Sequence, residues 1–409
     1  MVDTGDTAWI LISSALVMLM TPGLALFYGG MVRKKNIIST LMMSFAILGI
    51  VALLWVVYGY SLGFGNDLGG FIGGSSYLGL NGVGQDPSGV YGTTVPHLAF
   101  MMFQGMFAII TVALWTGSIV ERIKFSAVLV IAVAWFTLVY TPVAHWVWGG
   151  GWLGKLGALD FAGGTVVHIT AGAAALALAM ILGQRKGYKL EAMEPSNIPM
   201  IALGAALLWF GWFGFNAGSA LTSGGLASSA FVATNTSAAA AGVTWMILSW
   251  VHKRPTLAGT VTGAVVGLVA ITPAAGYVTP LAAIPIGAIG AVISYYAMVI
   301  RGKSRLDESL DVFACHGLGG TWGALATGIF ATTAVNAAGA DGLIAGNPIL
   351  VLKQLVAIAA VWAFTFGMTY GIVKLVQVTM GLRVSKTEET LGLDISQHGE
   401  RAYGGSLRG

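Results

Sequence analysis

Long apolar stretches alternate with short polar or charged segments along the chain. Eleven stretches can be distinguished. The length of each is near the ~20 residues that a helix needs to cross ~30 Å of hydrocarbon. They fall at residues 8–31, 38–64, 97–120, 125–147, 163–183, 198–217, 227–251, 257–276, 279–300, 312–334 and 349–380. The runs are long and do not alternate at every second residue, so the pattern predicts membrane-spanning helices rather than strands.

The composition supports the same fold class. The chain of 409 residues is 56% hydrophobic and only 9% charged, whereas a soluble domain carries about 25% charged residues. In lipid the backbone must satisfy its own hydrogen bonds, which helices do. The 59 glycines suit close packing between membrane helices. We therefore expect an all-α, polytopic membrane protein.

The charges in the connecting segments predict the orientation. Every second connection is basic, while the alternate connections hold only Lys155 and Lys353. The basic set is Arg33, Lys34, Lys35, Arg122, Lys124, Arg185, Lys186, Lys189, Lys253, Arg254, Arg301, Lys303 and Arg305. Because basic loops stay in the cytoplasm, a multi-pass protein of the cell membrane with its N-terminus outside and its C-terminus inside is expected. The net charge of +4 follows this topology and does not indicate a nucleic-acid partner.

A short pattern occurs twice and indicates an internal repeat. Residues 168–172, HITAG, and residues 316–320, HGLGG, share a histidine, then any two residues, then a small residue and a glycine. In the predicted topology their two segments run in opposite directions, which is typical of an inverted repeat. We expect helices 1–5 and 6–10 to form the repeat and helix 11 to lie outside it. A transmembrane domain would span 1–382, followed by a cytoplasmic regulatory tail at 383–409, either disordered or docked against the cytoplasmic loops.

The two histidines of this pattern, His168 and His316, lie inside apolar segments. A polar side chain at membrane depth faces a cavity or a partner. Each imidazole could simply join neighbouring helices by a hydrogen bond. Together, two neutral rings could form a polar strip along a narrow pore and relay protons. No metal site is expected, since Cys315 is the only cysteine and the histidines have no further ligands beside them.

Asp160 precedes the segment of His168, in the sequence DFAGG. An acid before small residues at a helix start favours an N-cap, in which the carboxylate accepts backbone N–H bonds. A direct cation ligand is the alternative.

Aromatic residues gather towards the predicted outer side, among them Phe103, Phe107, Trp148 and Phe215. They could belong to the aromatic belt of a membrane protein. Alternatively, their ring faces could attract a cation. Phe103 and Phe107 are four residues apart, so one helical face could carry both and narrow a channel. Ser219 could accept a hydrogen bond from a protonated guest.

Several longer motifs resemble the ammonium transporter (Amt/Rh) family, and its Amt branch in particular. The resemblance extends from about residue 7 to 402. It rests on HWVWGGGWL at 145–153, DFAGGTVVH at 160–168, WFGWFGFNAGSAL at 209–221, TNTSAAAAG at 234–242, CHGLGGTWGAL at 315–325, and GLRVS with TEETLGLDISQHGE in the tail.

The resemblance implies an eleven-helix homotrimer that is not an enzyme, needs no cofactor and has one pore in each subunit. It implies that Phe107, Trp148 and Ser219 recruit ammonium outside. Phe103 is expected in the same substrate-binding site because of its helical spacing to Phe107. It further implies that Phe107 and Phe215 form a gate, that His168 and His316 line the pore, and that Asp160 is required near the mouth. The tail would couple subunits and receive a cytoplasmic PII-type (GlnK-like) regulator.

These expectations combine into one functional prediction, with two rivals. NH₄⁺ would lose its proton near the phenyl rings, and NH₃ would cross along the histidines; the proton would either return or cross separately. K⁺ would be excluded because it has no proton to lose. The rivals are an ammonium sensor that signals through the tail and a metalloenzyme built on the histidines.

Overall fold

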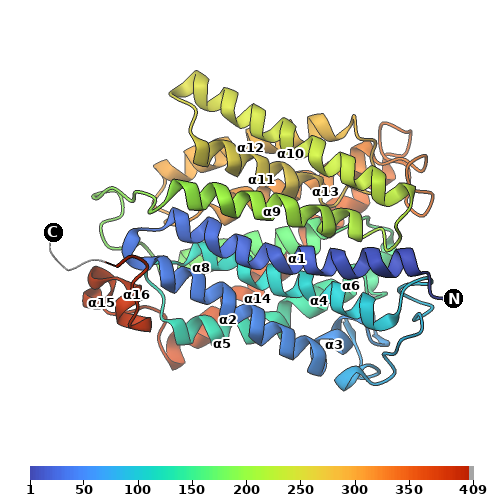
Figure 1. Cartoon of the computed structure of the whole chain (residues 1–409), viewed down its shortest axis with the longest axis horizontal. Coiled ribbons are helices and arrows are strands. Elements are labelled where there is room, and N and C mark those ends of the chain that lie inside the picture. The colour runs from blue at the N-terminus through green and yellow to red at the C-terminus, as the bar shows by residue number, and fades with distance from the viewer. Residues whose placement is uncertain (405–409) are drawn as a thin grey trace.

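Long helices lie side by side along one axis of the molecule (Figure 1). The computed structural model describes residues 1–404, and nine helices within this part are long and apolar enough to cross a membrane. The other two predicted crossings correspond to α11 (Leu257–Ile271) and to η7 (Phe313–Leu318) with α13 (Gly319–Phe330). The multi-pass helical fold is thus confirmed, and the count of eleven crossings stays a prediction.

The first half of the chain alternates α-helices with short π- and 3₁₀-helical turns and has one β-hairpin. Its elements are α1 (Thr4–Met31), η1 (Lys34–Asn36), α2 (Ile37–Leu54), η2 (Trp55–Gly59), α3 (Tyr60–Phe64), β1 (Asp67–Leu68), β2 (Ile72–Gly73), η3 (Leu78–Leu80), α4 (His97–Leu114), η4 (Trp115–Ser118), α5 (Phe125–Trp135), η5 (Phe136–Tyr140), α6 (Thr141–Val147), α7 (Trp152–Leu156), η6 (Gly164–Ile169) and α8 (Thr170–Leu182). The strands β1 and β2 pair antiparallel.

The second half has fewer interruptions. Besides α11, η7 and α13 it holds α9 (Ile198–Gly218), α10 (Gly225–His252), α12 (Ala283–Lys303), α14 (Ile349–Thr379), α15 (Lys386–Leu391) and α16 (Leu393–His398). The ends of the predicted segments differ from the observed ends by a few residues.

Close glycine contacts join the two halves where the predicted repeat requires them. Helix α1 packs along α9, and a Cβ on Gly204 would lie 2.7 Å from the Gly23 carbonyl oxygen. Helix α8 meets η7, where a Cβ on Gly172 would lie 2.1 Å from Cα of Gly317. In the reciprocal place, a Cβ on Gly320 would lie 2.9 Å from Cβ of His168. The first and last helices of the two halves thus pair across a common centre, as in an inverted repeat.

The N-terminus and the C-terminal helices α15 and α16 lie at opposite ends of the bundle (Figure 1). This placement requires an odd number of crossings. The tail contacts the loops at its end of the bundle: Leu393 N–H donates to the Asn36 side chain at 2.9 Å, and Asp394 accepts the Ser39 N–H at 2.9 Å. Up to residue 404 the tail therefore has the docked arrangement. Residues 405–409 of the predicted tail lie outside the described residues.

Candidate pore

A cavity of about 440 Å³ opens at the end of the bundle that carries the N-terminus, and we call it the outer cavity after the side predicted for that end. Its lining includes four of the predicted site residues and several further aromatic side chains. The predicted residues in its wall are Phe107, Trp148, Asp160 and Ser219. Helices α4, α6 and α9 and the loop before η6 thus bring together residues that lie far apart in the sequence.

Trp148 follows α6 and is held in a fixed orientation. Its indole Nε1–H donates to the Asp160 carbonyl oxygen at 2.9 Å. Its ring meets the ring of Phe107 edge to face, with centroids 6.0 Å apart and an interplanar angle of 88°. The indole therefore presents a fixed aromatic surface in the cavity wall, to which a cation is attracted.

Two side chains can offer hydrogen-bond acceptors in this cavity. The Ser219 hydroxyl donates to the Phe215 carbonyl oxygen at 2.8 Å, which leaves the lone pairs of its oxygen for a guest. Gln104 on α4 is 9% exposed, and its amide oxygen has no hydrogen-bond partner among the described residues. Sequence reasoning missed Gln104, although a polar side chain within an apolar segment is the signal that could have identified it.

A pair of phenyl rings lies at the inner end of this cavity. Phe107 from α4 and Phe215 from α9 are stacked, with centroids 4.1 Å apart and an interplanar angle of 24°. The ring centroid of Phe103 lies 4.9 Å from that of Phe107. Phe103 is fully buried, but it does not line the cavity. Gly218 lies against Phe103. The structure thus places Phe103 behind Phe107, as packing support rather than as part of the cavity wall.

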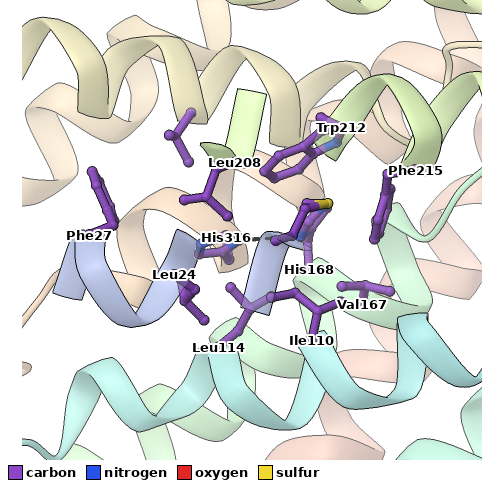
Figure 2. Close-up of a pocket in the computed structure, with 12 residues that line it drawn as sticks. Leu24, Phe27, Ile110, Leu114, Val167, His168, Leu208, Trp212, Phe215 and His316 are labelled. Carbon is purple, nitrogen blue, oxygen red and sulfur yellow. Dashed lines mark hydrogen bonds between the residues drawn. The ribbon is translucent and has the colours of Figure 1, made fainter. Parts of the chain in front are cut away.

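Beyond the phenyl pair lies a much smaller cavity of about 10 Å³, which is room for about one water-sized molecule (Figure 2). His168 and His316 both face it, and the rest of its wall is apolar or aromatic. The other labelled lining residues in Figure 2 are Leu24, Phe27, Ile110, Leu114, Val167, Leu208, Trp212 and Phe215.

The hydrogen bonds around the histidine pair indicate which ring nitrogen donates and which accepts. The Thr272 hydroxyl donates to the Leu268 carbonyl oxygen at 2.7 Å, and its oxygen accepts from Trp212 Nε1–H at 2.9 Å. His168 Nε2 lies 3.4 Å from the same oxygen and must therefore donate to it. For a neutral ring, Nδ1 of His168 then accepts, and His316 Nδ1–H donates to it across 3.2 Å. His316 Nε2 is left without a proton, so the pair is a neutral, oriented donor–acceptor chain.

Both histidines lie in π-helical turns, His168 in η6 and His316 in η7. Such wide turns often occur at functional sites. Because the two turns occupy matching places in the repeat, the rings meet at the centre of the molecule.

An inner cavity of about 150 Å³ continues the line towards the opposite end of the bundle. His316 lines both this cavity and the middle one, and Phe27 does so too. Asp311 is part of its wall and accepts from Arg301 Nε at 2.5 Å. Three cavities thus follow one another, separated by the phenyl pair and by the histidines.

The carboxylate of Asp160 is occupied by the start of η6. It accepts the N–H groups of Gly163 at 2.8 Å, Gly164 at 2.6 Å, Thr165 at 2.8 Å and Val166 at 3.2 Å, and also the Thr165 hydroxyl. This is the geometry of a helix cap. The capping bonds orient the carboxylate towards η6, although Asp160 also borders the outer cavity.

Comparison with known proteins identifies the family. Residues 8–403 match the Ammonium Transporter Family. The chain is 54% identical to an ammonium transporter of Bacillus subtilis, with 98% of this chain and 99% of the relative covered. It is 52% identical to the ammonium transporter Amt1 of Archaeoglobus fulgidus, with the same coverage.

Solved structures give the same result. The crystal structure of Saccharomyces cerevisiae Mep2 has a TM-score of 0.88 at 36% identity, covering 94% of this chain and 91% of that chain. A structure titled "Sensor Amt Protein" has a TM-score of 0.89 at 29% identity, covering 96% of this chain and 98% of that chain. The chain therefore belongs to the Ammonium Transporter Family.

Proposed function

We propose that this protein carries ammonium into the cell by conducting NH₃ through the pore between its two halves. NH₄⁺ binds in the outer cavity against Trp148 and Phe107, with the oxygen of Ser219 as an acceptor. The amide oxygen of Gln104 is a second acceptor. The ion loses a proton before it passes the phenyl pair.

The observation that carries the proposal is the sequence of three cavities and their barriers. The middle cavity holds about one water-sized molecule, and His168 and His316 are the polar groups that face it. A bare cation in such surroundings costs many kcal/mol, whereas NH₃ is small and neutral. NH₃ can donate to a bare imidazole nitrogen and accept from an imidazole N–H. K⁺ has no proton to lose, so the same barrier excludes it.

The test is uptake of labelled methylammonium into proteoliposomes, with K⁺ flux measured in parallel. His168→Ala and His316→Ala are expected to lose the wild-type discrimination against K⁺ or to lose uptake. His252→Ala, on the exposed end of α10, is the matched control. If both pore variants fold, reach the membrane and discriminate as the wild type does, the role of the pair is wrong.

The fate of the proton is measured separately. On a solid-supported membrane, a sustained ammonium-induced current would mean that charge crosses with the substrate. Uptake without current would mean that the proton is returned outside.

An ammonium sensor is the second candidate, favoured by the similarity to the structure titled "Sensor Amt Protein". The tail, docked on the loops at one end, could transmit a signal. Ammonium binding without flux in proteoliposomes would favour the sensor over the transporter.

Assembly and orientation complete the proposal. A homotrimer in the cell membrane, with the outer cavity outside and the tail at 383–409 in the cytoplasm, is expected from the family resemblance and the basic loops. A PII-type (GlnK-like) regulator would act on the tail and these loops. Native mass spectrometry of the purified protein, alone and with such a regulator, tests the stoichiometry and the contact.

A further inference from the structure

His145 is a fully buried histidine at the outer end, in α6, three residues before Trp148. Both of its ring nitrogens have partners from another part of the chain. Nδ1 lies 3.0 Å from the Gly63 carbonyl oxygen, and Nε2 lies 3.0 Å from Oδ1 of Asp67. Neither the pore nor the cation site uses this side chain.

Both partners of His145 are acceptors. The Gly63 carbonyl has only lone pairs to offer. Asp67 is ionised, because hydrogen bonds from Lys155 and His145 and from the Gly70 N–H hold the pKa of its carboxyl well below the usual range. A neutral imidazole has one N–H and could satisfy only one of the two. The contacts therefore require the doubly protonated ring, an imidazolium.

The imidazolium joins the segments that hold Trp148. Gly63 lies in α3 and Asp67 in the hairpin strand β1, whereas His145 belongs to α6, which ends beside Trp148. A Cβ on Gly149, the next residue, would lie 2.6 Å from the His145 ring nitrogen, so chain and ring are in close contact there.

Two further bonds tie the same hairpin to this region. Trp146 Nε1–H donates to the Phe71 carbonyl oxygen at 2.8 Å. The backbone N–H of Trp152 donates to the Gly70 carbonyl oxygen at 3.0 Å. The hairpin thus supports the segment on both sides of Trp148, with the imidazolium at its centre.

We propose that His145 is a positioning residue that, as an imidazolium, donates to both acceptors and so holds Trp148 in place at the outer cavity. The effect on uptake rests on the proposed function, whereas the charge on His145 does not. If the charged acceptor is removed, the hairpin loses its bond to the ring, Trp148 is held less firmly, and uptake falls.

Three further groups lie around the ring. Asp67 is the charged partner of the imidazolium, and Lys155 donates to the other oxygen of Asp67 at 2.5 Å. The Tyr91 hydroxyl donates to the Phe64 carbonyl oxygen at 2.7 Å, and it stays neutral because burial raises its pKa. Asp67 is therefore the charged acceptor whose removal tests the role of His145.

The first experiment measures the KM and the maximal rate of methylammonium uptake by proteoliposomes. Asp67→Asn should raise the KM several-fold, because the hairpin loses its charged bond to His145 and Trp148 is held less firmly. Asp86→Asn, an exposed acid of the same outer region, should leave both quantities unchanged. An unchanged KM in Asp67→Asn would overturn the proposal.

The second experiment reads the protonation state directly, by ¹⁵N NMR of labelled histidines in nanodiscs. The signals of His145 are assigned by their loss in His145→Gln or, if that variant does not fold, by their shift in Asp67→Asn. Two protonated nitrogens at pH 6 are expected, and a neutral ring there would overturn the proposal. An imidazolium in a wild-type protein without uptake would contradict the transport function alone.

Discussion

At the scale of single residues, the roles differ by what each polar group already binds. Both oxygens of Asp160 accept backbone N–H groups at the start of η6, so little of the carboxylate is left for a cation. By contrast, the amide oxygen of Gln104 has no partner among the described residues. The hydrogen-bond partners therefore distinguish Asp160, which shapes the mouth, from Gln104, which can accept a hydrogen bond from the substrate.

Asp160→Ala is expected to lower the melting temperature in detergent strongly, along with uptake. The substitution leaves several buried N–H groups without an acceptor, and each costs about 1–3 kcal/mol. Ser219→Ala is the contrast, with weaker ammonium binding and a nearly unchanged melting temperature. If Asp160→Ala instead weakened binding at unchanged stability, the acid would be a cation ligand and not a cap.

The candidate residues could be named from the sequence, but not all of their partners. His168 and His316 were identified because they share a short pattern inside apolar segments. Thr272, which orients His168, could not be identified from the sequence, because a threonine in an apolar segment usually bonds to the backbone of its own helix. Thr272 also makes such a bond, to the Leu268 carbonyl oxygen. The position of Phe103 behind Phe107 likewise depends on the packing of α9, which helical spacing alone does not contain.

At the scale of elements, hydrophobic pattern predicts the helices, whereas glycine contacts decide how closely they pack. Apolar length located the segments to within a few residues. The π-helical turns η2, η5, η6 and η7 were not predicted, since apolar periodicity does not separate them from an α-helix.

Gly172→Ala is expected to separate α8 from η7 and to abolish the native histidine contact. The added Cβ would lie 2.1 Å from Cα of Gly317, a backbone atom that cannot rotate away. We expect poor yield or a melting temperature lower by several degrees, measured by fluorescence-detected size exclusion after heating. Gly371→Ala in α14, whose Cβ would meet open space, is the matched control and should be neutral or stabilising. Equal stability of the two variants would contradict the packing described for the repeat.

Glu389→Ala is expected to release the tail from the loops. Oε1 of Glu389 accepts the Lys186 N–H at 2.6 Å, and Oε2 accepts from Arg383 at 2.8 Å. Without these bonds, trypsin should cut after Arg383 and Lys386 several times faster than in the wild type. Glu400→Ala, an exposed acid of the same tail, should leave the cleavage rate unchanged. An unchanged rate in Glu389→Ala would mean that other contacts hold the tail.

At the scale of the whole molecule, charge and apolar length predict a topology but not a pore. The basic connections and the paired pattern of His168 and His316 indicate two inverted halves. The three successive cavities arise only when α1 packs on α9 and η6 on η7, because their walls come from both halves. Which end faces the cytoplasm depends on the membrane, and so it is a matter for experiment.

The orientation can be tested with single cysteines in a Cys315→Ser background. Val2→Cys, next to the N-terminus, and Glu400→Cys, just after α16, place thiols at exposed positions. The N-terminus and α16 lie at opposite ends of the bundle (Figure 1). A membrane-impermeant maleimide should label the first in intact cells and the second only after permeabilisation, because the basic loops hold the tail's end in the cytoplasm. The reverse pattern would contradict the orientation. Labelling of both positions from one side would contradict the odd number of crossings, and with it the placement of the pore between the two halves.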